Sequence, residues 1–195
     1  MRTLNEYFLD LEIADISTVA SLAMKAVPEG GNVRKVYTAL QSAISVADAD
    51  VYLFRGKPLA ITEAATADAG ASVIFEVPAH GLRVGDYVYI KGSADSNYNG
   101  IFAVTAVADS THFKVTTTFT ADETSAEVLR VIGNGGTAAD GKITIAYSGS
   151  AEGDVDEAVP SGATKRVTKG DIIGAVSDGA STTAAKLAIT AVIDR

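Results

Sequence analysis

The amino-acid sequence predicts an all-β fold, a jelly-roll-like β-sandwich with a small β-barrel domain inserted between two of its strands. Short runs of β-branched and aromatic residues recur along the 195-residue chain, separated by turn residues at intervals of about 8 to 12 positions. Residues 77–115 alternate turns and strands so regularly that they form a recognisable unit. Segments of small and turn-forming residues flank the wider region 72–132, as linkers flank a domain.

The inserted barrel is predicted over residues 72–132. Strands are expected at 87–90, 101–107 and 113–118, because these runs are rich in aromatic and β-branched residues. Asn99-Gly100 predicts the reversal between the first two strands, since this pair accepts the positive φ angles of a tight hairpin. Asp109-Ser110 predicts the next reversal, and residues 127–132 close the unit.

The outer, discontinuous jelly-roll-like assembly domain is predicted over residues 1–63 plus 137–195, with linkers at 64–71 and 133–136. In residues 7–13, Leu9, Leu11 and Ile13 share one face of a strand, although a helix is the rival assignment. Residues 16–27 also fit either a helix or a strand. Other strands are expected at 33–40, 51–54, 58–62, 142–147, 171–176 and 185–193, with a hairpin between the second and third of these runs and a long polar excursion at 149–164.

Composition narrows the classes of function. The absence of cysteine excludes disulfides, thiol nucleophiles and cysteine-ligated metal centres. The net charge of −8 and scattered basic residues argue against nucleic acid as a partner. No run approaches the roughly 18 apolar residues of a membrane span, and the N-terminus lacks a secretion signal. We therefore expect a soluble protein with neither a nucleic-acid nor a membrane partner.

One loop resembles a calcium-binding sequence. Asp95, Asn97 and Asn99 followed by Gly100 match the D-x-N-x-N-G start of such a loop. Position twelve is Ala106, so the bidentate glutamate is missing, and strands flank the segment where helices would be needed. The sequence favours a hairpin turn over a calcium site.

The two histidines, His80 and His112, could suggest a metal pair or an acid–base pair. Neither has an acidic residue at a recognisable ligand or triad spacing, so a structural role in capping a turn is favoured. No nucleophile elbow or phosphate loop is present. We expect no cofactor, no metal site and no catalytic residue; the protein is not expected to be an enzyme.

Two resemblances indicate a place for the chain. The inserted segment has H-G-L-x-V-G-D-x-V from His80, Y-N-G from Tyr98 and T-x-F-x-V from Thr111. It resembles a small β-barrel module of tailed-bacteriophage structural proteins and also the small β-barrel half-domain of ubiquitin-activating enzymes, the latter implying no ubiquitin chemistry. The outer part resembles phage virion proteins of the head decoration or head fibre type at residues 13–18, 28–36, 47–51, 149–155, 170–173 and 179–185.

The resemblance implies a capsid decoration (cement) or head-fibre protein that binds and reinforces the outside of the capsid shell. Its partner would be the major capsid protein, its state a homotrimer, and its location the outer capsid surface of a virion assembled in the host cytoplasm. Leu4, Tyr7 and Phe8 are candidate capsid or subunit contacts, because an apolar and aromatic terminus is costly to leave in water.

The alternative function is a tail or fibre adhesin module that binds a host surface glycan. The inserted barrel would then present exposed tyrosines, for which Tyr87, Tyr89 and Tyr98 are the candidates. Core packing is the competing explanation for these rings. A polysaccharide-degrading enzyme is the third and least supported class.

Overall fold

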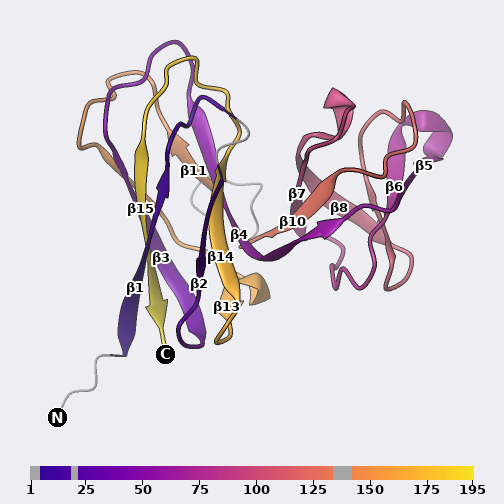
Figure 1. Cartoon of the computed structure of the whole chain (residues 1–195), viewed down its shortest axis with the longest axis horizontal. Helices are drawn as coiled ribbons and strands as arrows, with labels where there is room; N and C mark the ends of the chain where they lie inside the picture. The colour runs from indigo at the N-terminus through magenta and orange to yellow at the C-terminus, as the bar shows by residue number, and fades with distance from the viewer. Residues whose placement is uncertain (1–4, 19–21, 134–141) are drawn as a thin grey trace. The chain divides into compact units, whose positions relative to one another are not determined.

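A computed structural model describes residues 5–18, 22–133 and 142–195 of the chain, which form two compact units. Unit 1 comprises Met1–Arg55 and Ile132–Arg195, and unit 2 comprises Gly56–Val131 (Figure 1). Leu4 and most of the predicted linker at 133–136 lie outside the described residues. Within them, regular structure other than strands is limited to three short 3-10 turns, and no helix is long and apolar enough to cross a membrane.

Unit 1 is a sandwich of two antiparallel sheets with jelly-roll topology. One sheet has the order β1-β15-β3-β12, and the other contains β2, β14, β4 and β11 in that order. Counting these eight strands along the chain, the first pairs with the eighth, the second with the seventh, the third with the sixth and the fourth with the fifth. This is a long antiparallel hairpin rolled into two sheets, so the predicted fold class is confirmed. The strands are β1 (Glu6–Ile13), β2 (Leu22–Ala26), β3 (Gly31–Leu40), β4 (Ala49–Ala60), β11 (Lys142–Ile145), β12 (Val155–Ala158), β14 (Ile172–Ser177) and β15 (Leu187–Asp194).

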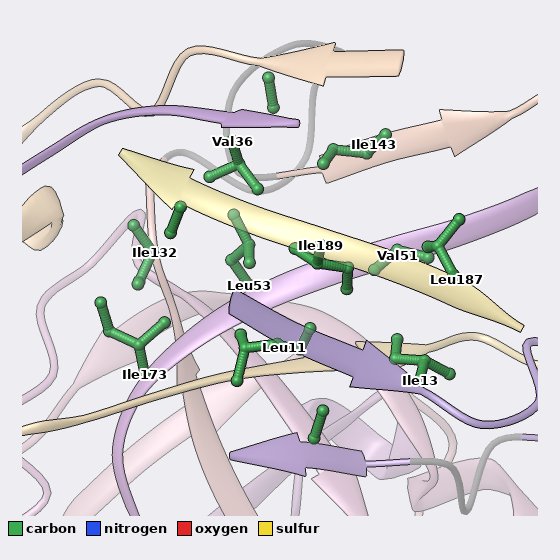
Figure 2. Packing of buried hydrophobic residues seen from close by; sticks show 14 of the residues in the cluster. Leu11, Ile13, Val36, Val51, Leu53, Ile132, Ile143, Ile173, Leu187 and Ile189 are labelled. Atoms are coloured by element: carbon green, nitrogen blue, oxygen red, sulfur yellow. The ribbon is translucent and has the colours of Figure 1, made fainter. Parts of the chain in front are cut away.

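The core of unit 1 lies between the two sheets. Alternate residues of β1 and β15 point inward, as their period-two pattern predicts. In Figure 2, Leu11 of β1, Ile189 of β15 and Leu53 of β4 point toward the same buried space. The last strand is packed into the domain as expected, since its inward residues are at most 1% exposed. A short strand, β13 (Arg166–Val167), adds to β3 after the 3-10 turn η3 (Ala163–Lys165).

The chain leaves unit 1 within its fourth strand, β4, and returns beside that strand. The amide of Ile132 donates to the carbonyl of Leu53 at 2.7 Å, so the two ends of the insertion are hydrogen-bonded neighbours within unit 1. The hairpin predicted between residues 51–54 and 58–62 is absent; β4 runs unbroken from Ala49 to Ala60. Gly56 adopts a φ of +90° inside this strand, which bends it without reversing it.

Unit 2 is an open antiparallel sheet, not a closed barrel. Its strands follow the order β10-β7-β8-β9-β6-β5, and no ladder joins the two ends of this path within residues 56–131. Isolated hydrogen bonds link the two ends of the sheet. The amide of Ile61 donates to the carbonyl of Ala126 at 2.9 Å, and the amide of Ala64 donates to Asp122 Oδ1 at 2.8 Å. The elements are β5 (Glu63–Ala67), η1 (Asp68–Gly70), β6 (Ser72–Glu76), β7 (Tyr87–Lys91), η2 (Ser96–Tyr98), β8 (Gly100–Val107), β9 (His112–Val115) and β10 (Glu127–Val131).

Two local predictions in unit 2 need correction. Residues 64–71, expected to be a linker, belong to β5 and η1, and β5 pairs with β6 through its whole length. Small residues were enough for this edge strand, because only Ala64 of β5 is buried. The reversal expected at Asn99-Gly100 instead spans residues 92–99 and includes η2, whereas the reversal at Asp109-Ser110 is confirmed.

Candidate functional site

The tyrosines predicted to bind a glycan are mostly inside unit 2. Tyr89 is 1% exposed and Tyr98 is 0% exposed, so neither presents a ring face to a ligand; only Tyr87 is half-buried. The Tyr98 hydroxyl donates to Ala121 O at 2.7 Å and accepts from the amides of Thr120 (3.1 Å) and Ala121 (3.2 Å). Its ring packs edge-on against Phe75, with centroids 5.5 Å apart. Tyr98 therefore anchors a loop to the core, and the expectation of an exposed contact is wrong for two of the three rings.

The calcium-like loop uses its oxygens internally. Asp95 Oδ1 accepts from the Asn97 amide at 2.8 Å, and its other oxygen accepts from the Thr120 hydroxyl. Asn99 Oδ1 accepts from the Ser93 amide at 3.0 Å. Across the residues that the structure describes, no three acidic, histidine or cysteine side chains gather as metal ligands would. These hydrogen bonds support the turn that the sequence favours over a calcium site.

His80 and His112 fix two turns of unit 2. The Leu82 amide donates to His80 Nδ1 at 2.9 Å, so Nε2 carries the ring hydrogen and donates to Asp109 O at 3.2 Å. His112 Nδ1 lies 3.0 Å from the Asp109 carboxylate. Hydrogen bonds from the hydroxyl and amide of Thr111 hold the pKa of Asp109 below its usual range, with His112 contributing. Both rings have the capping role that the sequence favours.

The structure places two of the three N-terminal contact candidates, Tyr7 and Phe8, and they differ in exposure. Tyr7 packs against the core of unit 1 and its hydroxyl donates to Glu29 O, so it stabilises the fold rather than offering a free surface. Burial raises the pKa of Tyr7, partly offset by the hydrogen bond to Glu29. Phe8 is 65% exposed on the outer face of β1, where it lies opposite Val192 of β15. Leu4 lies outside the described residues, which leaves Phe8 as the one placed candidate that is open to a partner.

Exposed apolar side chains are concentrated in unit 1. Seven large hydrophobic residues are exposed in the described part of the chain, and six of them belong to unit 1. Single exposed residues need no explanation, but a group of them marks an interaction surface. The six are Phe8, Met24, Val46, Tyr147, Val155 and Val159, and the seventh, in unit 2, is Val84.

Four of the six belong to residues 41–48 and 146–159, here called the end-loop surface. The two segments meet at one end of the sandwich, and β12 carries the second segment from there toward the middle of β3. The two segments are joined by hydrogen bonds from the Ile44 amide to Ser150 Oγ (3.0 Å) and from the Tyr147 amide to Asp48 Oδ1 (2.9 Å). A hollow of about 170 Å³ lies in this surface. It is lined by Ile145, Ala146, Ser148, Gly149, Ser150, Asp154, Val155 and Asp156.

The end-loop surface is acidic. Its two segments carry Asp48, Glu152, Asp154, Asp156 and Glu157, and no lysine, arginine or histidine. Glu157 pairs with a lysine of β3 at 3.0 Å, whereas Asp154 and Asp156 have no ion pair in the described residues. Burial and the neighbouring charge of Asp154 both raise the pKa of Asp156. The hollow is therefore lined by two carboxylates that repel each other.

Comparisons with known proteins leave the family open. No protein-family model and no curated protein matches the chain. Among solved structures, the chain is similar to a phage phi92 endosialidase over 56% of its length, at 16% identity and a TM-score of 0.31, and it spans 18% of that protein. A Crh5 transglycosylase in complex with NAG matches at 7% identity and a TM-score of 0.24, covering 98% of this chain and 84% of that one. Similarities this low carry no argument about function.

Sequence reasoning did not identify the end-loop surface. Residues 149–164 read as a polar excursion, and the strand within it, β12, carries two acidic residues between Val155 and Ala158. A usable signal was present in the composition of residues 146–159, which combine four acids with exposed apolar residues and lack any base. Its association with residues 41–48 depends on tertiary hydrogen bonds between segments about 100 positions apart, which local patterns do not encode.

Proposed function

We propose that the protein is a non-enzymatic structural component of a tailed-bacteriophage virion that binds the outside of the capsid shell as a decoration or head-fibre protein. Unit 1 is the part that assembles. The jelly-roll topology supports this proposal because such sandwiches recur in viral capsid proteins, although they also occur in lectins and other proteins. The sequence resemblance to phage decoration and fibre proteins points in the same direction.

The distribution of exposed apolar side chains carries the proposal. Six of the seven in the described residues lie on unit 1, so the surface suited to association belongs to that unit. Stable interfaces bury about 1,200–2,000 Å² and gain most of their free energy from a few apolar or aromatic anchors. Phe8, which is 65% exposed, is an anchor of this kind. Many copies joining adjacent shell subunits would slow their separation, since binding to the assembled state stabilises it.

We further propose a homotrimer, in keeping with the same resemblance. A trimer of 20.0 kDa chains has a mass of about 60 kDa. Light scattering coupled to size exclusion measures this mass directly. A monomer of one chain mass across the micromolar range would remove the trimer from the proposal without affecting attachment to the shell.

Shell binding tests the proposed function. Empty shells assembled from the accompanying major capsid protein are sedimented with purified protein, and cryo-electron microscopy locates the added density. We expect saturable binding on the outer surface, weakened about tenfold or more by Phe8→Ser. Val84→Ser in unit 2 is the matched control, because Val84 is also 65% exposed. Failure of the wild-type protein to bind shells, or density confined to the tail tip of virions, would refute the proposal.

A further inference from the structure

The end-loop surface combines an unusual loop with exposed apolar side chains. Val46 is 70% exposed and has a φ of +80°, a conformation that a β-branched residue rarely adopts. Hydrogen bonds hold this loop on both sides: Ile44 bonds to Ser150, and the Ser45 amide donates to Thr183 Oγ1 at 3.1 Å. An apolar side chain is thus kept in solvent by a backbone that the surrounding contacts determine.

The negative charge of the end-loop surface indicates which kind of ligand it can bind. Asp154 Oδ2 accepts from the Ala151 amide at 2.6 Å, but the Asp156 carboxylate has no hydrogen-bond partner among the described residues. No group described in the structure lowers the pKa of Asp156, while burial and Asp154 raise it. A cation placed between the two carboxylates would remove their repulsion and would compensate for the burial of Asp156.

We propose that the end-loop surface docks a protein partner by taking one of its lysine or arginine side chains into the hollow between Asp154 and Asp156. Val155 points to the opposite face of β12 from Asp156, so the aliphatic stem of the basic side chain lies against Ala146, which also lines the hollow and is exposed. Val46 and Tyr147, exposed on the loops that adjoin the hollow, are available to apolar neighbours of the basic residue.

The partner is a different protein rather than a second copy of this chain that presents the same surface. The chain carries a net charge of −8, and the end-loop surface has no basic residue, so two such surfaces repel each other. The identification of the partner as the shell protein rests on the proposed function. The basic side chain itself does not, because it follows from the hollow, its carboxylates and its apolar rim.

A small probe tests the hollow without any capsid. N-acetyl-lysine amide is titrated into the isotopically labelled full-length protein, and N-acetyl-norleucine amide, which lacks the ammonium group, is the control. We expect saturable, salt-sensitive shifts at the amides of Ser148, Val155 and Asp156 with the lysine probe alone. Asp154→Asn with Asp156→Asn should abolish them. Equal shifts with both probes, or shifts that persist in the double variant, would overturn the inference.

Shell binding then separates the two proposals. Asp154→Asn with Asp156→Asn should weaken binding to shells about tenfold or more, whereas Glu63→Gln with Glu76→Gln, on β5 and β6 of unit 2, should leave it within about twofold. Both pairs change the net charge equally. Wild-type binding that is unchanged in the first pair would overturn the inference and leave the proposed function standing. No binding to shells, together with a lysine-specific response in the hollow, would refute the proposed function alone.

Discussion

Tyr98→Phe distinguishes a structural tyrosine from a ligand-binding one. The substitution removes one hydroxyl that makes three hydrogen bonds, to Ala121 O and to the amides of Thr120 and Ala121. Each such bond contributes about 1 kcal/mol net. Thr120 and Ala121 are exposed residues, so water can replace part of the loss. We expect the free energy of unfolding of unit 2 to fall by about 2 kcal/mol.

Thermal unfolding measures this loss, and hydrogen exchange assigns it to the loop. In a unit of this size, 1 kcal/mol corresponds to about 4–8 °C, so Tm should fall by about 8–16 °C if unit 2 unfolds as one transition. Exchange at the amides of Thr120 and Ala121 should accelerate in the variant, because both lose their acceptor. Tyr87→Phe is the matched control: its ring is half-buried and its hydroxyl makes no described hydrogen bond, so a change below about 0.5 kcal/mol is expected.

The reasoning fails if Tyr98→Phe unfolds within about 0.5 kcal/mol of the wild type and the two amides keep their protection. Such a result would mean that the hydroxyl is not a structural anchor.

Three further predictions concern other buried contacts. Gly174→Ala should destabilise unit 1 by about 2–3 kcal/mol in urea denaturation, because the added Cβ would lie 2.0 Å from Cζ of Phe54. Burial opposes ionisation of Glu123, but hydrogen bonds from serine hydroxyls and backbone amides outweigh it and lower its pKa from 4.5 to about 2. The stability that the ionised carboxylate contributes is therefore complete above pH 4.5 and is lost as the pH falls toward 2. Glu123→Gln should flatten this acid part of the plot of unfolding free energy against pH. His80→Ala should cost about 2 kcal/mol by leaving the Leu82 amide without its acceptor, as thermal unfolding will show.

Each of these predictions has a contrary outcome. If Gly174→Ala unfolds at the same urea concentration as the wild type, the steric explanation is wrong. If the acid limb of the stability profile is the same in wild type and Glu123→Gln, the hydrogen bonds to this carboxylate do not stabilise unit 2. If His80→Ala unfolds within about 0.5 kcal/mol of the wild type, the anchoring role of His80 is wrong. His112→Ala should cost less, because His112 is more exposed.

The jelly roll could be predicted from the sequence because its inward residues alternate clearly. Leu9, Leu11 and Ile13 fall on one face of β1, and the residues of β15 follow the same rule. The pairing of the individual strands was not predicted, since it joins strands such as β1 and β15, whose residues lie about 180 positions apart. Alternation identifies a strand and its buried face, but it does not specify the partner strand.

The candidate site was harder to predict for a related reason. Aromatic residues in turn-rich segments suggested exposed rings, yet Tyr98 fills the core of unit 2 while only its hydroxyl reaches a loop. A tyrosine with one polar atom satisfies both environments, and the sequence alone does not say which end is outside. Conversely, Val46 and Val155 belong to residue types that usually lie in the core, and only the structure shows that they are exposed.

The rolled hairpin also explains why this fold accommodates an inserted unit. Unit 2 enters between the fourth and fifth strands, which is the tip of the hairpin, and the amide of Ile132 closes onto Leu53 where the chain returns. Closing a loop costs free energy that grows only with the logarithm of its length, so a long insertion here adds little cost once its ends already meet. The end-loop surface is built at the opposite end of β4 and β11, from connections that the insertion does not interrupt. Unit 1 can therefore carry an insertion and the proposed docking surface at once, because the two use different turns of the same hairpin.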